Sequence, residues 1–568
     1  MRALFFLLII VPHTGLCQTV FTEVSSLSGI NHKTVFLEEI MAAQGGAAWF
    51  DYNNDGWYDL YVTGGGNSDA LYQNEGDGTF SDQTVNSGIA AMSIVKTDGV
   101  TTGDYNRDGW TDIVVTTYRG EQNHLLKNNG DGTFDNIEWA AETDTGSSFS
   151  ACFGDLNLDG FLDLFVCNWP DFLSYQFSGG EPVSVAGAVN YYYENQGDGT
   201  FDEVSTNYGL DDPDGCGLGV IFSDYDNDQD LDIYLANDFG FFPENSENRL
   251  FRNDYPLDQW TEVSAINGLN VGMNGMGVAK ADINSDGLFD FYVTNINNDI
   301  LMISSQNGYE NELIARGLDN DTVWLQGFVD TEKKTGWGCA FVDVDNDMDE
   351  DLLTANGSLQ YDYPNPALDY NKLFLNNGAG YFTDYSVESG VDDPYVSRAL
   401  AYCDYDLDGD IDVFIGVTDT VNGSSHSFLY RNESTETNWF QVKAEGVVSN
   451  LDGIGTRVSL YTDGVLQIRE IGGESSFNSQ HWYVAHFGLG AHQTVDSIIV
   501  SWPGGGVDKF YDLTNNQLFE AVEGQGQGPA DCRRHAETSG ECRLFGRREE
   551  AQRDSADGGA GPEILSAG

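Results

Sequence analysis

The 568-residue sequence predicts an all-β protein, a seven-bladed β-propeller followed by a small β-sandwich or barrel domain. The first observation is a nine-residue acidic loop that recurs seven times, beginning at Asp51, Asp104, Asp155, Asp224, Asp282, Asp343 and Asp404. In addition, each copy is followed by a run of β-forming residues, and 67 glycines mark many turns. Repeats of about 50–70 residues with room for four short strands are typical of propeller blades, whereas β-helical solenoids, the structural alternative, have shorter repeats.

Every copy of the loop carries an oxygen-bearing side chain at its positions 1, 3, 5 and 9. Calcium takes about 6–8 oxygen ligands, and alternating side chains of a tight loop can converge on one ion. The backbone carbonyl of position 7 offers a further oxygen, and in loops four, six and seven this position is itself aspartate. The sequence therefore predicts Ca2+ as the bound cofactor.

The predicted metal ligands are Asp51, Asn53, Asp55, Trp57 and Asp59 in loop one; Asp104, Asn106, Asp108, Trp110 and Asp112 in loop two; Asp155, Asn157, Asp159, Phe161 and Asp163 in loop three; Asp224, Asp226, Asp228, Asp230 and Asp232 in loop four; Asp282, Asn284, Asp286, Leu288 and Asp290 in loop five; Asp343, Asp345, Asp347, Asp349 and Asp351 in loop six; and Asp404, Asp406, Asp408, Asp410 and Asp412 in loop seven.

Position 6 of the loop must turn sharply, so glycine is expected there. Loops four and six carry Gln229 and Met348 instead, and must either accept a left-handed residue or turn differently. Loop seven has aspartate at positions 3 and 7 and keeps Gly409, so it is predicted to bind Ca2+ most tightly. The motif is not an EF-hand, because position 12 of loop one is Val62 rather than glutamate and a strand follows.

The two ends of the predicted propeller, residues 18–435, complement each other. Phe21–Val24 has the pattern of a fourth strand but follows no hairpin, and the strand at 427–432 has no hairpin successor. Pairing these two strands would close the ring and remove both exposed sheet edges.

From Asn438 the pattern changes to alternating apolar and polar runs with glycine-rich turns, which predicts a second β domain over 436–524. Residues 525–568 are arginine-rich and poor in hydrophobic residues, and are predicted to be a disordered tail. Residues 1–17, a positive start followed by a short apolar run, are predicted to be a secretory signal peptide. Sequons at Asn320, Asn356, Asn422 and Asn432 fit a secreted glycoprotein.

The net charge of −66 argues against nucleic acid and anionic membranes as partners, and no later stretch is apolar enough to span a membrane.

Most cysteines are expected to be buried thiols, with Cys152–Cys167 and Cys532–Cys542 as possible bridges. His481, His486 and His492 lie close together but fit no zinc motif, and are more typical of histidines at hairpin ends or in a core. No Gly-x-Ser-x-Gly sequence occurs, so the protein is predicted not to be an enzyme.

The acidic loops and hairpins such as Leu71–Phe80 resemble FG-GAP/VCBS repeats, which build the propellers of integrin α-subunits. The segments Gly453–Val458, Gln467–Glu470, Ser479–Gln480, His486–Gly490 and Val500–Gly504 resemble the ASPIC/UnbV domain. Together the two parts resemble the cartilage acidic protein family. The resemblance implies a secreted, extracellular calcium-binding protein that interacts with another extracellular protein or a matrix component.

Two functions are therefore considered. The favoured one is a secreted, non-catalytic interaction protein whose loops are held by Ca2+. The alternative is a carbohydrate-binding or carbohydrate-active protein, in which Tyr191–Tyr193 and the insertion at 169–190 would stack on sugars. The same aromatic residues would serve equally well as packing between blades.

Overall fold

The computed structural model describes residues 20–35, 44–92, 94, 96–137, 147–170, 176–178, 181–184, 186–240, 247–296, 298–318, 334–357, 369–418, 427–434 and 437–526. The predicted signal peptide and residues 527–568 of the predicted tail lie outside these ranges, as do Asn320, Asn422, Cys532 and Cys542. None of the helices in the described ranges is long and apolar enough to cross a membrane.

Within the described part of residues 21–432, seven antiparallel sheets of four strands form, and each contains one acidic loop. In chain order they are β2 (Ala47–Phe50), β3 (Asp59–Val62), β4 (Ala70–Asn74) and β5 (Phe80–Asp82); β6 (Thr97–Gly103), β7 (Asp112–Thr117), β8 (His124–Asn128) and β9 (Phe134–Ile137); β10 (Ser147–Gly154), β11 (Asp163–Trp169), β14 (Tyr191–Asn195) and β15 (Phe201–Glu203); β16 (Gly217–Ser223), β17 (Asp232–Asn237), β18 (Arg249–Asn253) and β19 (Trp260–Glu262); β20 (Val278–Ala281), β21 (Asp290–Val293), β22 (Ile300–Ile303) and β23 (Glu310–Asn311); β24 (Gly336–Val342), β25 (Asp351–Asn356), β26 (Lys372–Leu375) and β27 (Thr383–Asp384); and β28 (Ser397–Cys403), β29 (Asp412–Val417) and β30 (Phe428–Asn432) with β1 (Phe21–Glu23).

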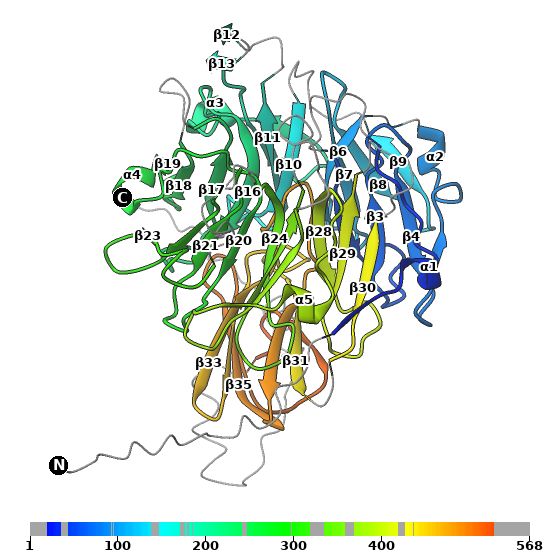
Figure 1. Ribbon diagram of the computed structural model, residues 1–568, viewed down its shortest axis with the longest axis vertical. Coiled ribbons are helices and arrows are strands. Elements are labelled where there is room, and N and C mark those ends of the chain that lie inside the picture. Colours follow the sequence, from blue (N-terminus) through cyan, green and yellow to red (C-terminus); the bar gives the residue numbers. More distant parts are fainter. Residues whose placement is uncertain are drawn as a thin grey trace, which may run out of the picture.

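Five short helices and one extra pair of strands accompany the seven sheets in the described part of the chain. The one-turn helices α1 (Ser25–Ser28), α2 (Ile89–Met92), α3 (Ser205–Tyr208), α4 (Ser264–Asn267) and α5 (Ser386–Ser389) each follow a fourth strand, and β12 (Gln176–Ser178) pairs with β13 (Glu181–Ser184). The first strands of the sheets contact one another in the cyclic order β2, β6, β10, β16, β20, β24, β28 and back to β2. In Figure 1 the outer strands β4, β9, β19 and β23 lie toward the perimeter of this ring.

The predicted closure of the ring is confirmed. Phe21 pairs with Asn432 and Glu23 with Tyr430, so the first described strand completes the sheet of the last three. Both ends of the propeller chain are thereby held in one sheet, in which β1 is the outermost strand. The prediction of an all-β, propeller-like fold followed by a second β unit is confirmed as well.

An asparagine at the end of the third strand joins neighbouring sheets. In six of the seven sheets its side-chain amide donates to the carbonyl of loop position 2 in the preceding sheet, as Asn195 Nδ2 does to Tyr105 O at 2.8 Å. The other five bonds, of 2.7–3.1 Å, come from Asn74, Asn128, Asn253, Asn376 and Asn432. Ser304 takes this place in the sheet of loop five. The recurring Leu-Tyr-x-Asn pattern therefore marks a contact between sheets.

Residues 438–522 form two further sheets, which Figure 1 shows in orange at the lower end of the molecule. One contains β31 (Asn438–Glu445), paired with β34 (Ala485–Gly490) and, in parallel, with β37 (Leu518–Val522). The other contains β32 (Arg457–Thr462), β33 (Val465–Glu470), β35 (Thr494–Ser501) and β36 (Val507–Thr514). Phe440, Phe487 and Trp502 lie in the core between them.

The second domain inserts one segment, residues 474–484, among the first strands of the ring. This segment, here called the plug, donates from Gln480 N to Ala47 O at 2.8 Å and accepts from Val100 N at Asn478 O at 3.1 Å. Across the ring, Cys339 N donates to Ser476 O at 3.2 Å. The ring of Phe477 lies 5.0 Å from that of Trp337 and is fully buried. The plug thus ties together strands from opposite sides of the ring.

The structure corrects three expectations. Cys152 and Cys167 are free, buried thiols, because the register of β10 and β11 places Phe165, not Cys167, opposite Cys152. Tyr192 and Tyr193 are each 1% exposed and pack between strands, so they are not available for stacking on sugars. Asn356 and Asn432 are likewise buried, with their amides donating to backbone carbonyls, so these two sequons are not glycan acceptors in the folded chain.

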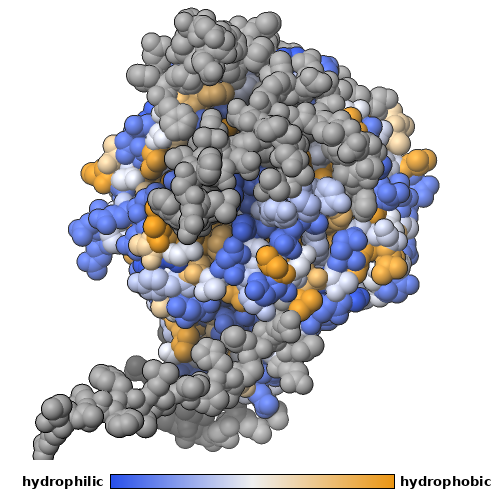
Figure 2. All heavy atoms as spheres, viewed as in Figure 1, coloured by the Kyte–Doolittle hydropathy of each residue, from blue (hydrophilic) through white to orange (hydrophobic). Residues whose placement is uncertain are grey.

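On the face shown in Figure 2, hydrophobic residues are scattered among hydrophilic ones rather than gathered into a broad patch.

We predict that Asn195→Ala lowers the free energy of unfolding by about 2–4 kcal/mol, because it removes two buried hydrogen bonds and leaves two carbonyls unpaired. Gln196→Ala, a change at the exposed neighbouring side chain, is the control and is expected to have an effect within about 0.5 kcal/mol. Urea unfolding measures both. Equal stability of the two variants would show that the asparagine does not hold the sheets together.

Candidate metal centres at the domain interface

The acidic loops all lie at one end of the sheets. Each begins after the first strand of its sheet, and its position 9 is the first residue of the second strand, as with Asp51 after β2 and Asp59 in β3. Because the seven sheets share this arrangement, the ring presents seven loops on the same end. The sequence predicted the position of each loop in its hairpin correctly.

The aspartate at position 1 organises the backbone of each loop. One of its carboxylate oxygens accepts the N–H of position 5 and the other accepts that of position 6, at 2.7–3.1 Å in all seven loops. Position 6 has a positive φ in every loop, including 79° at Gln229 and 90° at Met348. Loops four and six therefore accept the left-handed residue rather than turn differently.

The aspartate at position 9 is buried and fixed by the neighbouring strand. Its Oδ1 accepts the backbone N–H at the end of the third strand, at 2.7–2.9 Å in all seven sheets. Burial, with smaller contributions from nearby carboxylates, raises the pKa of Asp112 to about 8 and that of Asp290 to about 7. The pKa values of Asp59, Asp163, Asp232, Asp351 and Asp412 are raised well above the usual range for the same reason.

In loops four, six and seven, carboxylates converge on one point. Ligand atoms of three carboxylates lie within 4.8 Å of one another in the sets Asp224, Asp226 and Asp232; Asp343, Asp345 and Asp347; and Asp404, Asp406 and Asp412. Buried oxygens of Asp230, Asp345, Asp349 and Asp406 accept no hydrogen bond from the residues that the structure describes. Carboxylate oxygens that are out of water and without a donor are unfavourable unless a cation neutralises them. The residues in these three loops therefore fit a bound cation.

The other four loops use asparagine at position 3. The Asn53 and Asn157 amides donate to the position-5 aspartate of their own loop, at 2.8 and 3.3 Å, and Asn106 donates to Asp112 at 3.0 Å. In loop five, Asn284 Oδ1 accepts from Asp286 N at 3.0 Å. At position 7 the backbone N–H groups of Trp57, Trp110, Phe161 and Leu288 donate to the position-5 aspartate at 2.9–3.1 Å. These hydrogen bonds link residues of the predicted ligand set within each of the four loops, whose metal binding stays a prediction.

Position 4 of the loops connects one loop to the next, which the sequence reasoning missed. Asn54 donates to Gly109 O at 2.9 Å, Arg107 donates to Gly160 O at 2.6 Å, and Asn346 donates to Gly409 O at 3.3 Å. In each case a side chain at position 4 reaches the carbonyl of position 6 in the following loop. All seven position-4 residues have a positive φ of 57–64°. Asparagine at three of the seven positions, Asn54, Asn227 and Asn346, was the available sequence signal, because asparagine tolerates this conformation.

The second domain sits directly on the loops. Gln441 Nε2 donates to Asp404 Oδ2 at 2.8 Å, and Gly488 N donates to Asp343 Oδ2 at 3.1 Å. On loop two, Asp104 N donates to Asp452 at 2.7 Å. Arg457 bridges loops four and five, because it hydrogen-bonds to Asn227 and donates to Gly287 O at 2.7 Å. The domain therefore contacts the same aspartates that are predicted to hold the metal.

A buried ion pair adds to this interface. Lys280 at the end of β20 lies 2.5 Å from Glu470 at the end of β33, and both side chains are at most 1% exposed. The Lys280 ammonium also donates to Phe222 O and Gly472 O, at 2.7 and 3.1 Å. A buried charge that lost its partner would destabilise the fold strongly. Loss of either partner would therefore weaken the contact between the ring and the second domain.

The histidines support the expectation that they pack rather than catalyse. His481 lies in the plug, stacks on Tyr402 at 4.1 Å and accepts its N–H. His486 lies in β34 and donates to Asn346 Oδ1 at 2.8 Å. Burial lowers the pKa of each to about 3, so both are neutral. They contact different parts of the ring and do not form a joint site.

Comparison with known proteins agrees with this architecture. Residues 446–528 match the ASPIC and UnbV family, and residues 51–115 and 104–166 match the FG-GAP-like repeat family. Cartilage acidic protein 1 of Xenopus tropicalis is 28% identical over 235 residues, which cover 40% of this chain and 34% of the relative. The Homo sapiens protein of the same name is 27% identical over 291 residues, which cover 46% of this chain and 40% of the relative. The chain thus spans well under half the length of these relatives.

Similar solved structures are more distant. A GH74 xyloglucanase from Xanthomonas campestris has a TM-score of 0.40 at 11% identity, covering 87% of this chain and 74% of that one. An Agrocybe aegerita lectin that recognises non-reducing terminal N-acetylglucosamine has a TM-score of 0.37 at 16% identity, covering 60% and 79%. Neither likeness carries an argument about function. The chain contains FG-GAP-like repeats and, C-terminal to them, an ASPIC and UnbV domain, and part of it is similar to cartilage acidic protein 1.

Proposed function

We propose that the protein is a secreted, non-catalytic interaction protein whose ring of loops binds Ca2+. The observation that carries the proposal is the set of buried, unpaired carboxylate oxygens at Asp230, Asp345, Asp349 and Asp406. They belong to the loops in which carboxylates converge within 4.8 Å. These oxygens accept no hydrogen bond from the described residues, and a bound cation would compensate their negative charge.

Calcium suits the donor set better than other metals. The predicted ligands are carboxylate, amide and backbone oxygens, which hard cations prefer, and none is a thiolate or imidazole. Magnesium demands about six ligands in near-ideal octahedral geometry and usually keeps several waters. A loop that offers its side chains from alternate positions and a backbone carbonyl fits the larger and more adaptable shell of Ca2+.

The role of calcium in this proposal is to hold the loops and the second domain together. Each bound ion would cancel two of the negative charges that crowd the end of the ring. The second domain contacts Asp343 and Asp404 through Gly488 and Gln441. Fixing these aspartates around an ion would therefore also fix the surface on which the domain docks.

The remaining parts of the proposal rest on sequence and packing. The predicted signal peptide and the high acidity support an extracellular location, where calcium is abundant. A non-catalytic role is supported by the neutral, buried state of His481 and His486. The partner is proposed to be an extracellular protein or matrix component, which would bind to the exposed loops of the rigid scaffold.

Thermal unfolding across a calcium series tests the proposal. Ions that bind only the folded chain stabilise it by about 2.7 kcal/mol per site at 100 times the Kd, so the midpoint should rise steeply. Asp406→Ala in loop seven should lose more of this rise than Asn53→Ala in loop one, because loop seven is expected to be the tightest site. Asp135→Ala, which changes an exposed acid in β9 outside the loops, is the control and should behave like the native chain. An unfolding midpoint that does not change with calcium would contradict the proposal. So would a larger loss of the calcium-induced rise in Asn53→Ala than in Asp406→Ala.

The effect of pH should reverse between metal-free and calcium-loaded protein. Burial and neighbouring carboxylates raise the pKa of Asp230, Asp345 and Asp410 to about 8, so the metal-free fold favours their protonated forms. Their stabilising contribution is complete below about pH 4 and is lost as pH rises through about 8. Calcium binds the ionised forms, so loaded protein should instead gain stability as pH rises. Melting curves between about pH 5 and 8 with and without calcium measure both trends, and parallel trends would refute the assignment.

A further inference from the structure

Six Asn-Gly pairs lie within the described ranges, and a protein chain can modify itself at such pairs. The backbone nitrogen of the glycine attacks the side-chain carbonyl carbon of the asparagine, because glycine has no side chain that blocks the approach. A glycine N–H that is already donated to an acceptor must first give up that hydrogen bond. The six pairs are Asn129–Gly130, Asn267–Gly268, Asn274–Gly275, Asn307–Gly308, Asn356–Gly357 and Asn377–Gly378.

One of these six glycines differs from the others in its N–H group. Within the described part of the chain, Gly378 N donates to no acceptor. The other five are donors: Gly130 to Asn128 Oδ1 at 3.0 Å, Gly268 to Ser264 O, Gly275 to Asn237 O at 2.9 Å, Gly308 to Ser305 O at 3.1 Å and Gly357 to Thr335 O at 3.0 Å. Asn377 and Gly378 are both exposed, so water reaches this pair.

The second sheet provides a comparison, because its hairpin between β8 and β9 contains the same tripeptide, Asn-Asn-Gly. There Asp131 Oδ1 accepts the N–H and the hydroxyl of Thr133, at 3.1 and 2.6 Å. Gly130 N donates to Asn128 Oδ1. The sixth sheet has Ala379 at the place of this aspartate, so its turn is held in a different way.

In the sixth sheet, between β26 and β27, asparagine side chains hold the turn. Asn377 Oδ1 accepts the backbone N–H groups of Ala379 and Tyr381, at 3.1 and 3.3 Å. Asn376 Oδ1 accepts from Asn377 N at 2.8 Å, whereas its counterpart in the second sheet accepts from the glycine. The nitrogen of Gly378 is thereby left available. The difference between the two hairpins comes from the fold of the turn, since the tripeptide is the same.

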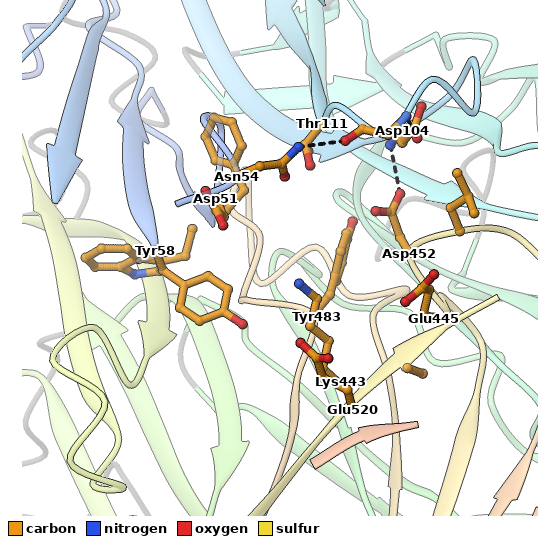
Figure 3. Close-up of a pocket in the computed structure, with 15 residues that line it drawn as sticks. Asp51, Asn54, Tyr58, Asp104, Thr111, Lys443, Glu445, Asp452, Tyr483 and Glu520 are labelled. Carbon is orange, nitrogen blue, oxygen red and sulfur yellow. Dashed lines mark hydrogen bonds between the residues drawn. The ribbon is translucent and has the colours of Figure 1, made fainter. Parts of the chain in front are cut away.

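The two donors on Asn377 Oδ1 also favour the reaction. They polarise the side-chain carbonyl and would stabilise the negative charge that develops on this oxygen as Gly378 N adds to Cγ. The leaving nitrogen, Nδ2, donates to no described residue. Other exposed asparagines are tied through this atom. Asn129 Nδ2 donates to a threonine hydroxyl at 3.1 Å, and Asn54 Nδ2 donates to Gly109 O at 2.9 Å, as Figure 3 shows.

We propose that Asn377 is a site of self-modification, at which the side-chain amide is converted to a carboxyl group. A bond forms between Gly378 N and Asn377 Cγ, the bond from Cγ to Nδ2 breaks, and ammonia leaves with the proton of Gly378 N. Water then opens the cyclic imide at either of its ring C–N bonds, which gives aspartate or isoaspartate at position 377. No electrons are transferred, and water is the co-reactant.

The product carboxylate would lie beside loop six. A Cβ added at Gly378 would come 3.3 Å from Asp349 Oδ2, so the hairpin and this loop are close neighbours. Conversion would therefore add a negative charge next to a predicted calcium ligand. The inference goes beyond the proposed function and does not depend on it, because the reaction uses only the residues of the turn and water.

The experiment is incubation of the full, folded chain at mildly alkaline pH, followed by peptide mapping that separates asparagine, aspartate and isoaspartate. Asn377 should lose its amide about 3- to 10-fold faster than Asn129, the ratio expected for one hydrogen bond. Asn129 is the matched control, because it is exposed and lies in the same tripeptide at the equivalent turn. The double variant Ala379→Asp/Tyr381→Thr gives the sixth hairpin the residues of the second, and should slow Asn377 to the rate of Asn129.

A second incubation in urea separates the effect of the fold from that of the sequence. Without the fold, Asn377 and Asn129 should convert at similar rates, because their local sequences match. Equal rates in the folded chain, a faster loss at Asn129 or no loss at Asn377 would overturn the inference. A difference of the same size in urea would overturn it as well, since the sequence and not the turn would then select the site.

Discussion

The rest of this structure depends on how the buried carboxylates at one end of the ring are compensated. Position 9 of every acidic loop begins a buried strand, and position 1 binds the loop's own backbone. Ionised carboxylates in such places are unfavourable unless hydrogen bonds or cations compensate them. Backbone N–H groups donate to the aspartates at positions 1 and 9, but buried oxygens of Asp230, Asp345, Asp349 and Asp406 accept no hydrogen bond from the described residues. Calcium is the compensation that the donor set favours.

The second domain also interacts with these carboxylates. It lies on the crowded end of the ring, brings Arg457, Arg469 and Gln441 against the loops, and sends the plug among the first strands. A ring of sheets closed by one short strand has a weak point at its closure. The plug adds hydrogen bonds to strands on opposite sides of the ring. The asparagines add hydrogen bonds between neighbouring sheets, so the ring is also held together away from its closure. The second domain therefore contacts the ring both at its loops and among its first strands.

Much of the architecture could be predicted from the sequence, because it repeats. The loop pattern, the hairpins and the unpaired strand at Phe21–Val24 recur at intervals that place every loop and the closure of the ring. What could not be predicted depends on contacts between distant residues. Asn478 and Val100, or Lys280 and Glu470, carry no local pattern that reveals their pairing. The sequence left two roles open for Tyr191–Tyr193 for a related reason, since an aromatic run has the same pattern whether it faces solvent or a neighbouring sheet.

The most direct test of the central claim is to count calcium ions bound to the purified chain, by elemental analysis after removal of free metal. The account predicts several tightly held ions per chain, and a reduced count when Asp406 is replaced by alanine. A chain that is folded, with its second domain docked, yet holds no calcium would contradict it, and the unpaired carboxylates would then have to be protonated.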